Sequence, residues 1–172
     1  MSAAISLAEL NAMSQADFTV RLGAIFEHSP WVAERAAAQR PFASVAQLHA
    51  AMADAVRAAS EDERLRLIRA HPELAGRAAV CGELTDESTR EQKGAGLDQC
   101  GAAEFERIQD LNRRYNAKFG FPFVIAVKGH DRHSILRQFA QRLNNERDVE
   151  ADGCIEQIIR IGGFRLGDAV RE

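Results

Sequence analysis

His71 is the residue of this chain whose type and setting most favour chemistry. It stands directly before Pro72, and a proline disfavours helical backbone in the residue before it, so His71 cannot continue the helical segment 64–70. The pKa of histidine lies near neutrality, so an imidazole on a rigid turn can act as an acid or a base. The same side chain can equally bond the last carbonyls of the helix that it closes, and the residues alone leave both interpretations open.

A second polar group follows further along the chain. Ser88, Glu91 and Gln92 are spaced i, i+3 and i+4, so a helix displays them on one face. Glu91 can accept hydrogen bonds, and Gln92 can both donate and accept them. Ser88 and Glu91 also fit a capping box, which is a structural device, and the two interpretations are compatible.

The other four histidines have simpler explanations. His28, His49, His130 and His133 lie near expected helix ends or on mixed faces, where surface and capping roles are common. His130 and His133 are three residues apart, but two ligands without nearby partners do not make a zinc site. The sequence therefore predicts no metal site.

The elements that position these groups are predicted to be helices, with one exception. The exception is the segment 121–127. Before this segment, apolar residues at spacings of three and four indicate a helix, namely Phe105, Ile108, Leu111, Tyr115 and Phe119. Gly120 fits the position just past that helix, and Pro122 keeps it from resuming, so 121–127 is predicted to be a buried extended segment. Without a sheet partner, its N–H and C=O groups need other partners. A small polar ligand with amide-like edges is one candidate, and ordinary core packing is the alternative.

Serine-based capping signals open several of the other helices. The pairs are Ser6 with Glu9, Ser14 with Asp17, Ser44 with Gln47, and Ser60 with Glu63. Residues 74–86 are expected to form a loop, and Gly162-Gly163 interrupts the last helical pattern. No repeat or long linker divides the chain. The prediction is an all-α, single-domain bundle of about eight or nine helices over residues 1–172.

Composition narrows the class of protein. The chain has 172 residues, 46% hydrophobic and 27% charged, which suits one globular domain. A net charge of −3 gives no reason to expect nucleic acid or an anionic membrane as partner. Three separated cysteines, Cys81, Cys100 and Cys154, indicate a reducing compartment. With no signal peptide, no apolar run near about 20 residues and no peroxisomal tripeptide, a cytoplasmic location is expected.

Several motifs in a fixed order give the chain a family resemblance. They are Phe26-Glu27-His28-Ser29-Pro30-Trp31-Val32-Ala33, Arg40-Pro41-Phe42, His71-Pro72-Glu73-Leu74-Ala75-Gly76, Ser88-Thr89-Arg90-Glu91-Gln92 with Gly94-Ala95-Gly96-Leu97, and Leu111-Asn112 leading into FGFPFVIAV. This combination closely resembles the 2-oxo-4-hydroxy-4-carboxy-5-ureidoimidazoline (OHCU) decarboxylases of urate catabolism. The resemblance covers nearly the whole chain, and several long motifs in order are more specific than any one of them.

The resemblance implies an enzyme, a carboxy-lyase that converts OHCU into (S)-allantoin, with His71 as its catalytic acid or base. It also implies a set of substrate-binding residues: Pro72, Ser88, Thr89, Arg90, Glu91, Gln92, Phe123, Val124, Ile125, Ala126, Val127 and Arg165. Arg160 competes with Arg165 for the last role, because the glycine pair before Phe164 makes the register uncertain. Similar proteins are commonly homodimers.

The implied substrate carries its own electron sink. Its hydroxyl and carboxylate share one carbon, beside a C=N bond attached to a ureido group, and that bond can receive the electron pair left by carbon dioxide. No cofactor is therefore expected. Two other classes remain open: a non-catalytic helical ligand-binding module, and a structural subunit of a purine-degrading assembly.

Overall fold

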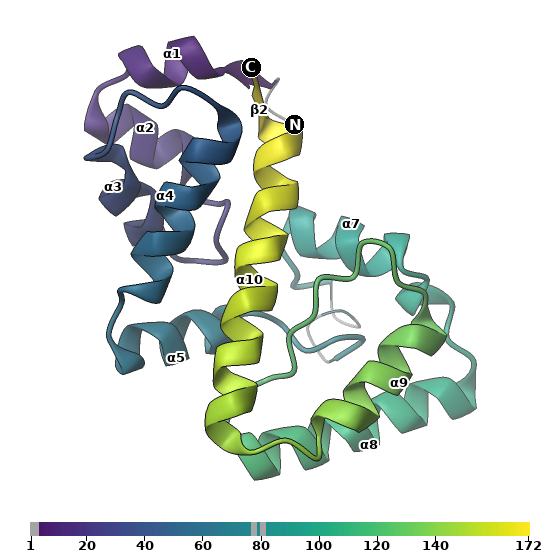
Figure 1. Ribbon diagram of the computed structural model, residues 1–172. Helices are drawn as coiled ribbons and strands as arrows, with labels where there is room; N and C mark the ends of the chain where they lie inside the picture. The colour runs from purple at the N-terminus through teal and green to yellow at the C-terminus, as the bar shows by residue number, and fades with distance from the viewer. Residues whose placement is uncertain (1–3, 77–78, 80–81) are drawn as a thin grey trace. The chain divides into compact units, whose positions relative to one another are not determined.

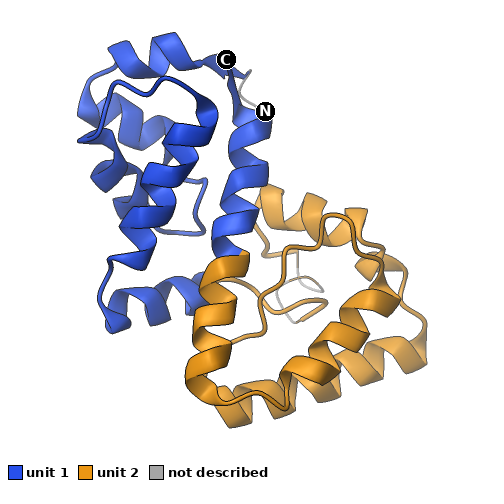
Figure 2. Ribbon diagram, viewed as in Figure 1, with its two compact units in different colours: residues 1–70, 158–172 blue, residues 71–157 orange. Residues whose placement is uncertain are grey.

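A computed structural model describes residues 4–76, 79 and 82–172 (Figure 1). These residues form nine α-helices, one 3-10 helix and one two-stranded parallel sheet, which confirms the all-α prediction. The chain divides into two compact units, one of Met1–Ala70 with Ile158–Glu172 and one of His71–Gln157 (Figure 2). No helix in the described ranges has both the length and the apolar character that a membrane span needs.

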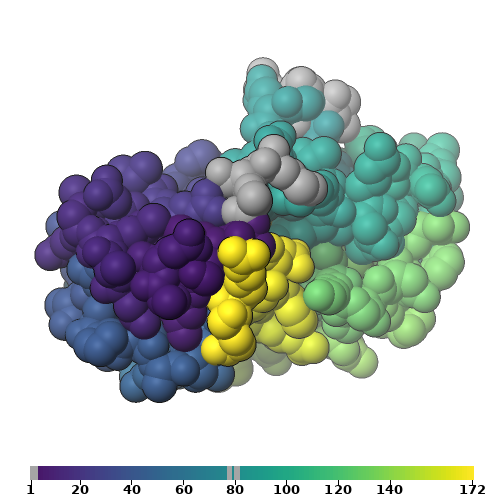
Figure 3. Space-filling model, turned by 90° about the horizontal axis from the view of Figure 1, so that it is seen from above, coloured from purple at the N-terminus to yellow at the C-terminus, as the bar shows by residue number. Residues whose placement is uncertain are grey.

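Unit 1 contains the first part of the chain and the C-terminal part of the last helix. Its elements are β1 (Ile5–Ser6), α1 (Leu7–Ala12), α2 (Gln15–Leu22), α3 (Trp31–Ala37), α4 (Val45–Arg57), α5 (Glu61–Ala70), the end of α10 (Arg147–Ala169) and β2 (Val170–Arg171). β1 pairs with β2 in parallel, with Ile5 opposite Val170. The pairing brings β1, near the start of the chain, next to β2, near its end, where purple meets yellow in Figure 3.

The serine caps of unit 1 form as predicted. Ser6 and Glu9 make a complete capping box, and the hydroxyls of Ser14 and Ser44 accept hydrogen bonds from the main-chain N–H three residues on. Ser60 likewise accepts from Glu63 N, while the Glu63 carboxylate accepts from Ser60 N. The short local signals therefore specify where these helices begin.

The expectation that Gly162-Gly163 interrupts the last helix is wrong. α10 runs without a break through both glycines. A Cβ at Gly162 would lie 2.7 Å from the Phe26 ring, and one at Gly163 would lie 3.0 Å from the His49 ring. The glycines serve close packing of aromatic rings against the helix, and tertiary contact outweighs their poor helix propensity.

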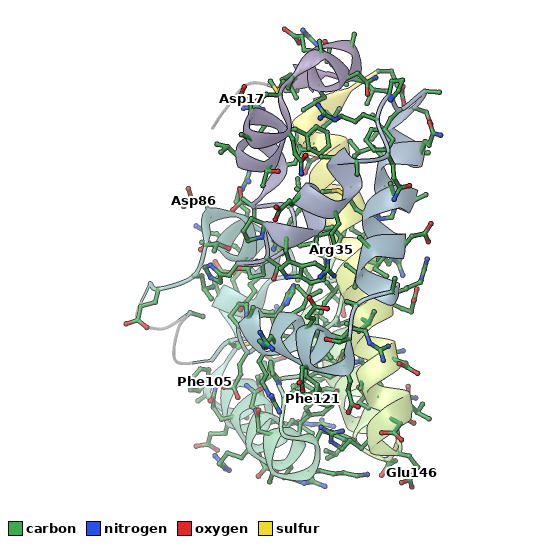
Figure 4. All side chains as sticks on the ribbon, turned by 90° about the vertical axis from the view of Figure 1, so that its left-hand side faces the viewer. Asp17, Arg35, Asp86, Phe105, Phe121 and Glu146 are labelled. Carbon is green, nitrogen blue, oxygen red and sulfur yellow. The ribbon has the colours of Figure 1, made fainter. Side chains whose placement is uncertain are left out.

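Unit 2 carries most of the residues expected to do chemistry. Its elements are α7 (Asp86–Gly94), the 3-10 helix η1 (Leu97–Gln99), α8 (Ala102–Phe119), α9 (Arg132–Arg142) and the beginning of α10. Five aromatic rings pack together in its core: Tyr115, Phe119, Phe121, Phe123 and Phe139. Figure 4 shows Phe121 among the side chains of this unit.

The segment 121–127 is buried, as predicted, and follows Gly120, which has the expected left-handed φ of 76°. It belongs to neither strand of the sheet and crosses unit 2 without regular structure (Figure 1). The expectation of a loop over 74–86 is wrong at two described positions, because Ala79 is helical and α7 begins at Asp86. Residues 77–78 and 80–81 of that loop lie outside the described residues.

Candidate active site

His71 lies immediately after α5 and is buried, with 7% of its surface exposed. Pro72 and Glu73 follow it half-buried, and Leu74 and Ala75 are buried again. Histidine is intermediate among residue types in how often it is buried, so the near-complete burial of His71 on an irregular turn is informative. The setting fits an acid or base that is kept away from bulk water.

Helix α7 presents the predicted polar group on one face. Ser88 and Gln92 are buried and Glu91 is half-buried, so all three point inward. Thr89 and Arg90 are exposed on the other side of α7. The Thr89 hydroxyl donates to Thr85 O, and Arg90 pairs with Glu87. Of the five predicted residues of this helix, three therefore face inward and two face outward.

The interpretation of Ser88 and Glu91 as a capping box is wrong. The N-cap of α7 is Thr85, whose hydroxyl accepts a hydrogen bond from Ser88 N at 3.3 Å. Ser88 thus lies one turn inside the helix. Ser88 and Glu91 are therefore not the capping pair of this helix, and their role in substrate binding stays a prediction.

Gln92 connects α7 to the turn that follows His71. Its Oε1 accepts from Ala75 N at 2.9 Å, and its Nε2 donates to Glu73 O at 3.4 Å. One N–H and one lone pair of this amide remain for other partners. Gln92 therefore supports the His71 turn in addition to any contact with a ligand.

Two side chains hold the segment 121–127. Arg142 Nη1 donates to Val124 O at 2.7 Å, and Gln157 Oε1 accepts from Ala126 N at 3.0 Å. Alternate residues of an extended chain present their main-chain groups to the same edge. Along the described part of the chain, the main-chain groups of Phe123 and Ile125 have no hydrogen-bond partner, so they remain available to a ligand.

Arg142 belongs to a buried charged cluster. Its Nε donates to Glu150 Oε1 at 2.6 Å, and its Nη2 lies 3.3 Å from Cys154 Sγ. The Tyr115 hydroxyl donates to the same Glu150 oxygen and lies 3.4 Å from the Cys154 sulfur. Burial raises the pKa of Tyr115 above its ordinary value, and the nearby Cys154 and Glu150 raise it further. Burial also raises the pKa of the Cys154 thiol, against the opposing effect of Arg142.

The two candidate arginines of α10 differ sharply in environment. Arg165 is buried in unit 1, where its Nη1 lies 2.8 Å from Glu27 Oε2. Arg160 is exposed, with its guanidinium 5.7 Å from the Phe164 ring. The buried arginine has the fixed geometry that anion recognition needs. Sequence reasoning gave no role to its partner Glu27, although Glu27 lies within one of the family-like motifs.

Three of the other four histidines have hydrogen-bond or ion-pair partners. His49 Nε2 lies 2.8 Å from Ile159 O, His130 Nδ1 lies 3.0 Å from Ser134 Oγ, and His133 Nδ1 lies 3.4 Å from Glu104. His28 is exposed and has a left-handed φ of 46°. Within 4–76, 79 and 82–172, no group of three His, Cys, Asp or Glu side chains is arranged to hold a metal ion.

Sequence reasoning missed several residues that support the site. Arg142 and Gln157 hold the segment 121–127, and Gln109 and Asn116 bind the His71 turn. One signal was present: Gln109, Asn112 and Asn116 recur at spacings of three and four, so they share one face of α8.

Several known proteins are similar to this chain over nearly its whole length. The family model described as OHCU decarboxylase matches residues 11–167. The uric acid degradation bifunctional protein PucL of Bacillus subtilis is 42% identical over 95% of this chain, and the chain spans only 32% of that protein. The 2-oxo-4-hydroxy-4-carboxy-5-ureidoimidazoline decarboxylase of Haloferax volcanii is 39% identical over 95% of both chains. The crystal structure of (S)-allantoin synthase matches with a TM-score of 0.77 at 30% identity, covering 96% of this chain and 54% of that one.

Proposed function

We propose that this chain, which belongs to the OHCU decarboxylase family, decarboxylates OHCU to (S)-allantoin in urate degradation. The observation that carries the proposal is the burial of His71 on a proline-fixed turn, in the same unit that buries Ser88, Gln92 and the segment 121–127. The names of the relatives support the substrate and the product.

The proposed reaction uses the substrate as its own electron sink. The bond to the carboxylate breaks, carbon dioxide leaves, and the electron pair forms a double bond to the neighbouring carbon while the C=N nitrogen takes up a proton. The carbon that bears the ureido group then receives a proton, and the enol hydroxyl loses one to become a carbonyl. In this proposal His71 contacts the hydroxyl and carboxylate carbon and helps to deliver the proton to one face of the intermediate. Acid–base assistance of this kind typically contributes about 10²–10⁴ in rate.

The other predicted residues would hold the ring in one orientation. Glu91 would accept from ureido N–H groups, and Ser88 and Gln92 would bind polar edges of the substrate from the same helix face. Main-chain groups of Phe123 to Val127 would bind the ring, and Pro72 would line the site. Direct contact with substrate also remains our proposal for Thr89, Arg90 and Arg165, although Thr89 and Arg90 face outward on α7. Positioning by such contacts lowers the entropic part of the barrier.

No cofactor is needed in this mechanism, because the adjacent C=N accepts the electron pair that pyridoxal phosphate, thiamine or a metal would otherwise stabilise. Activity should therefore be unchanged after exhaustive chelation and dialysis. Activity that is lost on chelation and restored by zinc would overturn this part of the proposal.

We also propose that the two compact units act as one domain, and that the enzyme is a cytoplasmic homodimer. The family match across both units supports the first point. The family resemblance supports the dimer, and the separated cysteines support a reducing compartment. Light scattering during size-exclusion chromatography measures the mass directly, and a monomer at micromolar concentration would refute the dimer.

One assay tests the activity itself. Urate oxidase and hydroxyisourate hydrolase generate the unstable substrate from urate, and optical rotation then follows the product. Spontaneous decay gives racemic allantoin, so one enantiomer should accumulate only when this protein is present. A racemic product at the uncatalysed rate would favour a binding module or a structural subunit instead.

A further inference from the structure

Four carboxamide side chains converge on the turn that follows His71-Pro72. One is Gln92 of α7, and the others are Gln109, Asn112 and Asn116 from one face of α8. All four bind the three residues Glu73, Leu74 and Ala75. Side chains from two helices therefore hold a stretch that has no regular structure of its own.

The bonds account for most polar groups of the turn. Gln92 binds Ala75 N and Glu73 O, as described above, and Gln109 Nε2 donates to Ala75 O at 2.7 Å. Asn112 Nδ2 donates to Leu74 O at 3.1 Å, and Asn116 Nδ2 donates to the Glu73 carboxylate. Asn116 Nδ2 also donates to the main-chain carbonyl of Asn112 at 3.0 Å, one turn earlier in α8.

The turn needs this support for two reasons. Ala75 has a φ of 47°, a left-handed conformation that residues with a Cβ rarely adopt. Leu74 and Ala75 are also buried, so their N–H and C=O groups cannot be satisfied by bulk water. The chain is tightly folded here, since a Cβ at Gly76 would lie 2.7 Å from Glu73 Cβ.

Carboxamides suit this task beside a proton-transferring histidine. They donate and accept hydrogen bonds, yet they neither titrate nor add a charge that would shift the pKa of the imidazole. Asn112 is used only as a donor: its Oδ1 is buried and has no hydrogen-bond partner among the described residues. The main-chain carbonyl of Leu74 thus fixes the orientation of this amide.

We propose that Gln92, Gln109, Asn112 and Asn116 form a carboxamide clamp that positions His71 for catalysis by fixing residues 73–75. The proposal rests on the proposed function, because it assigns these residues to the reaction of His71. They are positioning residues that act through the turn, and the clamp adds to Gln92 a role distinct from contact with substrate.

Hydrogen exchange at the Ala75 amide tests the clamp without any assay of activity. Ala75 N–H should exchange slowly in the native protein, and Gln92→Met should accelerate its exchange at least about 10-fold, because the accepting oxygen is gone. Exchange at Ala75 that is unchanged in the folded Gln92→Met protein would overturn the clamp. This result does not depend on whether the proposed function is correct.

A double-mutant cycle tests whether the clamp acts through His71. Gln109→Met keeps the length of the side chain but removes the donor to Ala75 O. We expect kcat per folded molecule to fall about 10- to 100-fold with a smaller change in KM, because misplacement of a catalytic group lowers turnover. In a His71→Asn background the same change should have almost no further effect. Gln138→Met is the matched control, since Gln138 is an exposed glutamine of α9, and it should leave kcat unchanged.

The outcomes separate the two proposals. A native enzyme that gives only racemic allantoin refutes the proposed function, whereas a native enzyme that is active and a Gln109→Met kcat within twofold of it refutes the clamp. The clamp would also be refuted if the fold-reductions in kcat caused by Gln109→Met and His71→Asn multiplied in the double variant, because the two residues would then act independently. If Gln109→Met does not fold, Asn116→Ser at a half-buried position removes only the contacts with Glu73 and Asn112 and serves the same cycle.

Discussion

The turn at residues 73–75 and the segment at 121–127 solve the same physical problem with different chemistry. Both are irregular stretches of main chain within unit 2, and all of their residues except the half-buried Glu73 are buried. Neutral carboxamides alone hold the turn, whereas the segment is held by a carboxamide at Ala126 and by a guanidinium at Val124. That guanidinium is itself embedded among a carboxylate, a phenol and a thiol.

The two kinds of support differ in the free energy that is lost when one side chain is removed. A neutral amide that is lost leaves one or two polar groups unpaired, which costs about 1–3 kcal/mol. A buried charge that loses its partner costs more, because the remaining ion stays in a poorly solvated place. Groups of the charged cluster titrate, whereas the four amides of the carboxamide clamp do not.

The largest expected effect is on stability, from Arg142→Met. The substitution leaves Glu150, which is 1% exposed, without its guanidinium partner and frees Val124 O. We expect the free energy of unfolding to fall by about 3–5 kcal/mol, as measured by urea denaturation. A loss below about 1 kcal/mol would show that the charged cluster does not hold the segment.

Arg137, on the same helix as Arg142, offers a matched control. Arg137 is exposed on α9, and within the described structure no ion pair or hydrogen bond is found for its side chain. Arg137→Met makes the same chemical change and should alter stability by less than about 0.5 kcal/mol. An equal loss in both variants would point to general charge effects instead of the cluster.

The next largest effect is on turnover, from His71→Asn. Asparagine is close to imidazole in size and can hydrogen-bond, but it does not titrate near neutral pH. The clamp residues stay in place, so the melting temperature should change little while kcat falls by about 10² or more. The product should also drift toward the racemic mixture. A folded His71→Asn protein with near-normal rate and stereoselectivity would refute the catalytic role.

Local signals in the sequence predicted the helices well but not their tertiary supports. The capping serines, the position of Gly120 and the burial of 121–127 depend on neighbours in the chain, and the structure confirms them. Gly162-Gly163 was misjudged because its reason lies in the rings of Phe26 and His49, far away in the sequence. Propensity alone does not contain such contacts.

The site followed the same rule. Residue types and spacing singled out His71 and one face of α7 as candidates. The structure buries His71, Ser88 and Gln92, and their role in the reaction stays a prediction. The sequence did not show the hydrogen bond between Gln92 and Ala75 or the one between Arg142 and Val124, because both depend on how separate segments pack. The polar face of α8 was visible as a spacing, yet only the structure shows which turn it binds.

The smallest expected effect separates the two supports by their response to alkaline pH. Burial raises the pKa values of Cys154 and Tyr115 in the folded state above 9.0 and 10.0, the ordinary values of these groups. The unfolded chain therefore releases these protons at a pH where the folded chain keeps them, so deprotonation favours unfolding. Stability should be complete below about pH 8 and should fall as the pH rises toward and past 9.0, by about 1 kcal/mol between pH 7.5 and 9.5.

Variants assign this loss to the charged cluster. Cys154→Ala should flatten the fall in unfolding free energy between pH 8 and 10, because the thiol that must stay protonated is gone, and Tyr115→Phe should flatten it mainly above pH 10. Gln109→Met should lower stability by the same amount at every pH in this range, because a carboxamide does not titrate. Urea unfolding of the three variants and the native protein at each pH gives the slopes. A pH dependence that is steeper in Gln109→Met, or unchanged in Cys154→Ala, would contradict the division into a neutral and a titratable support.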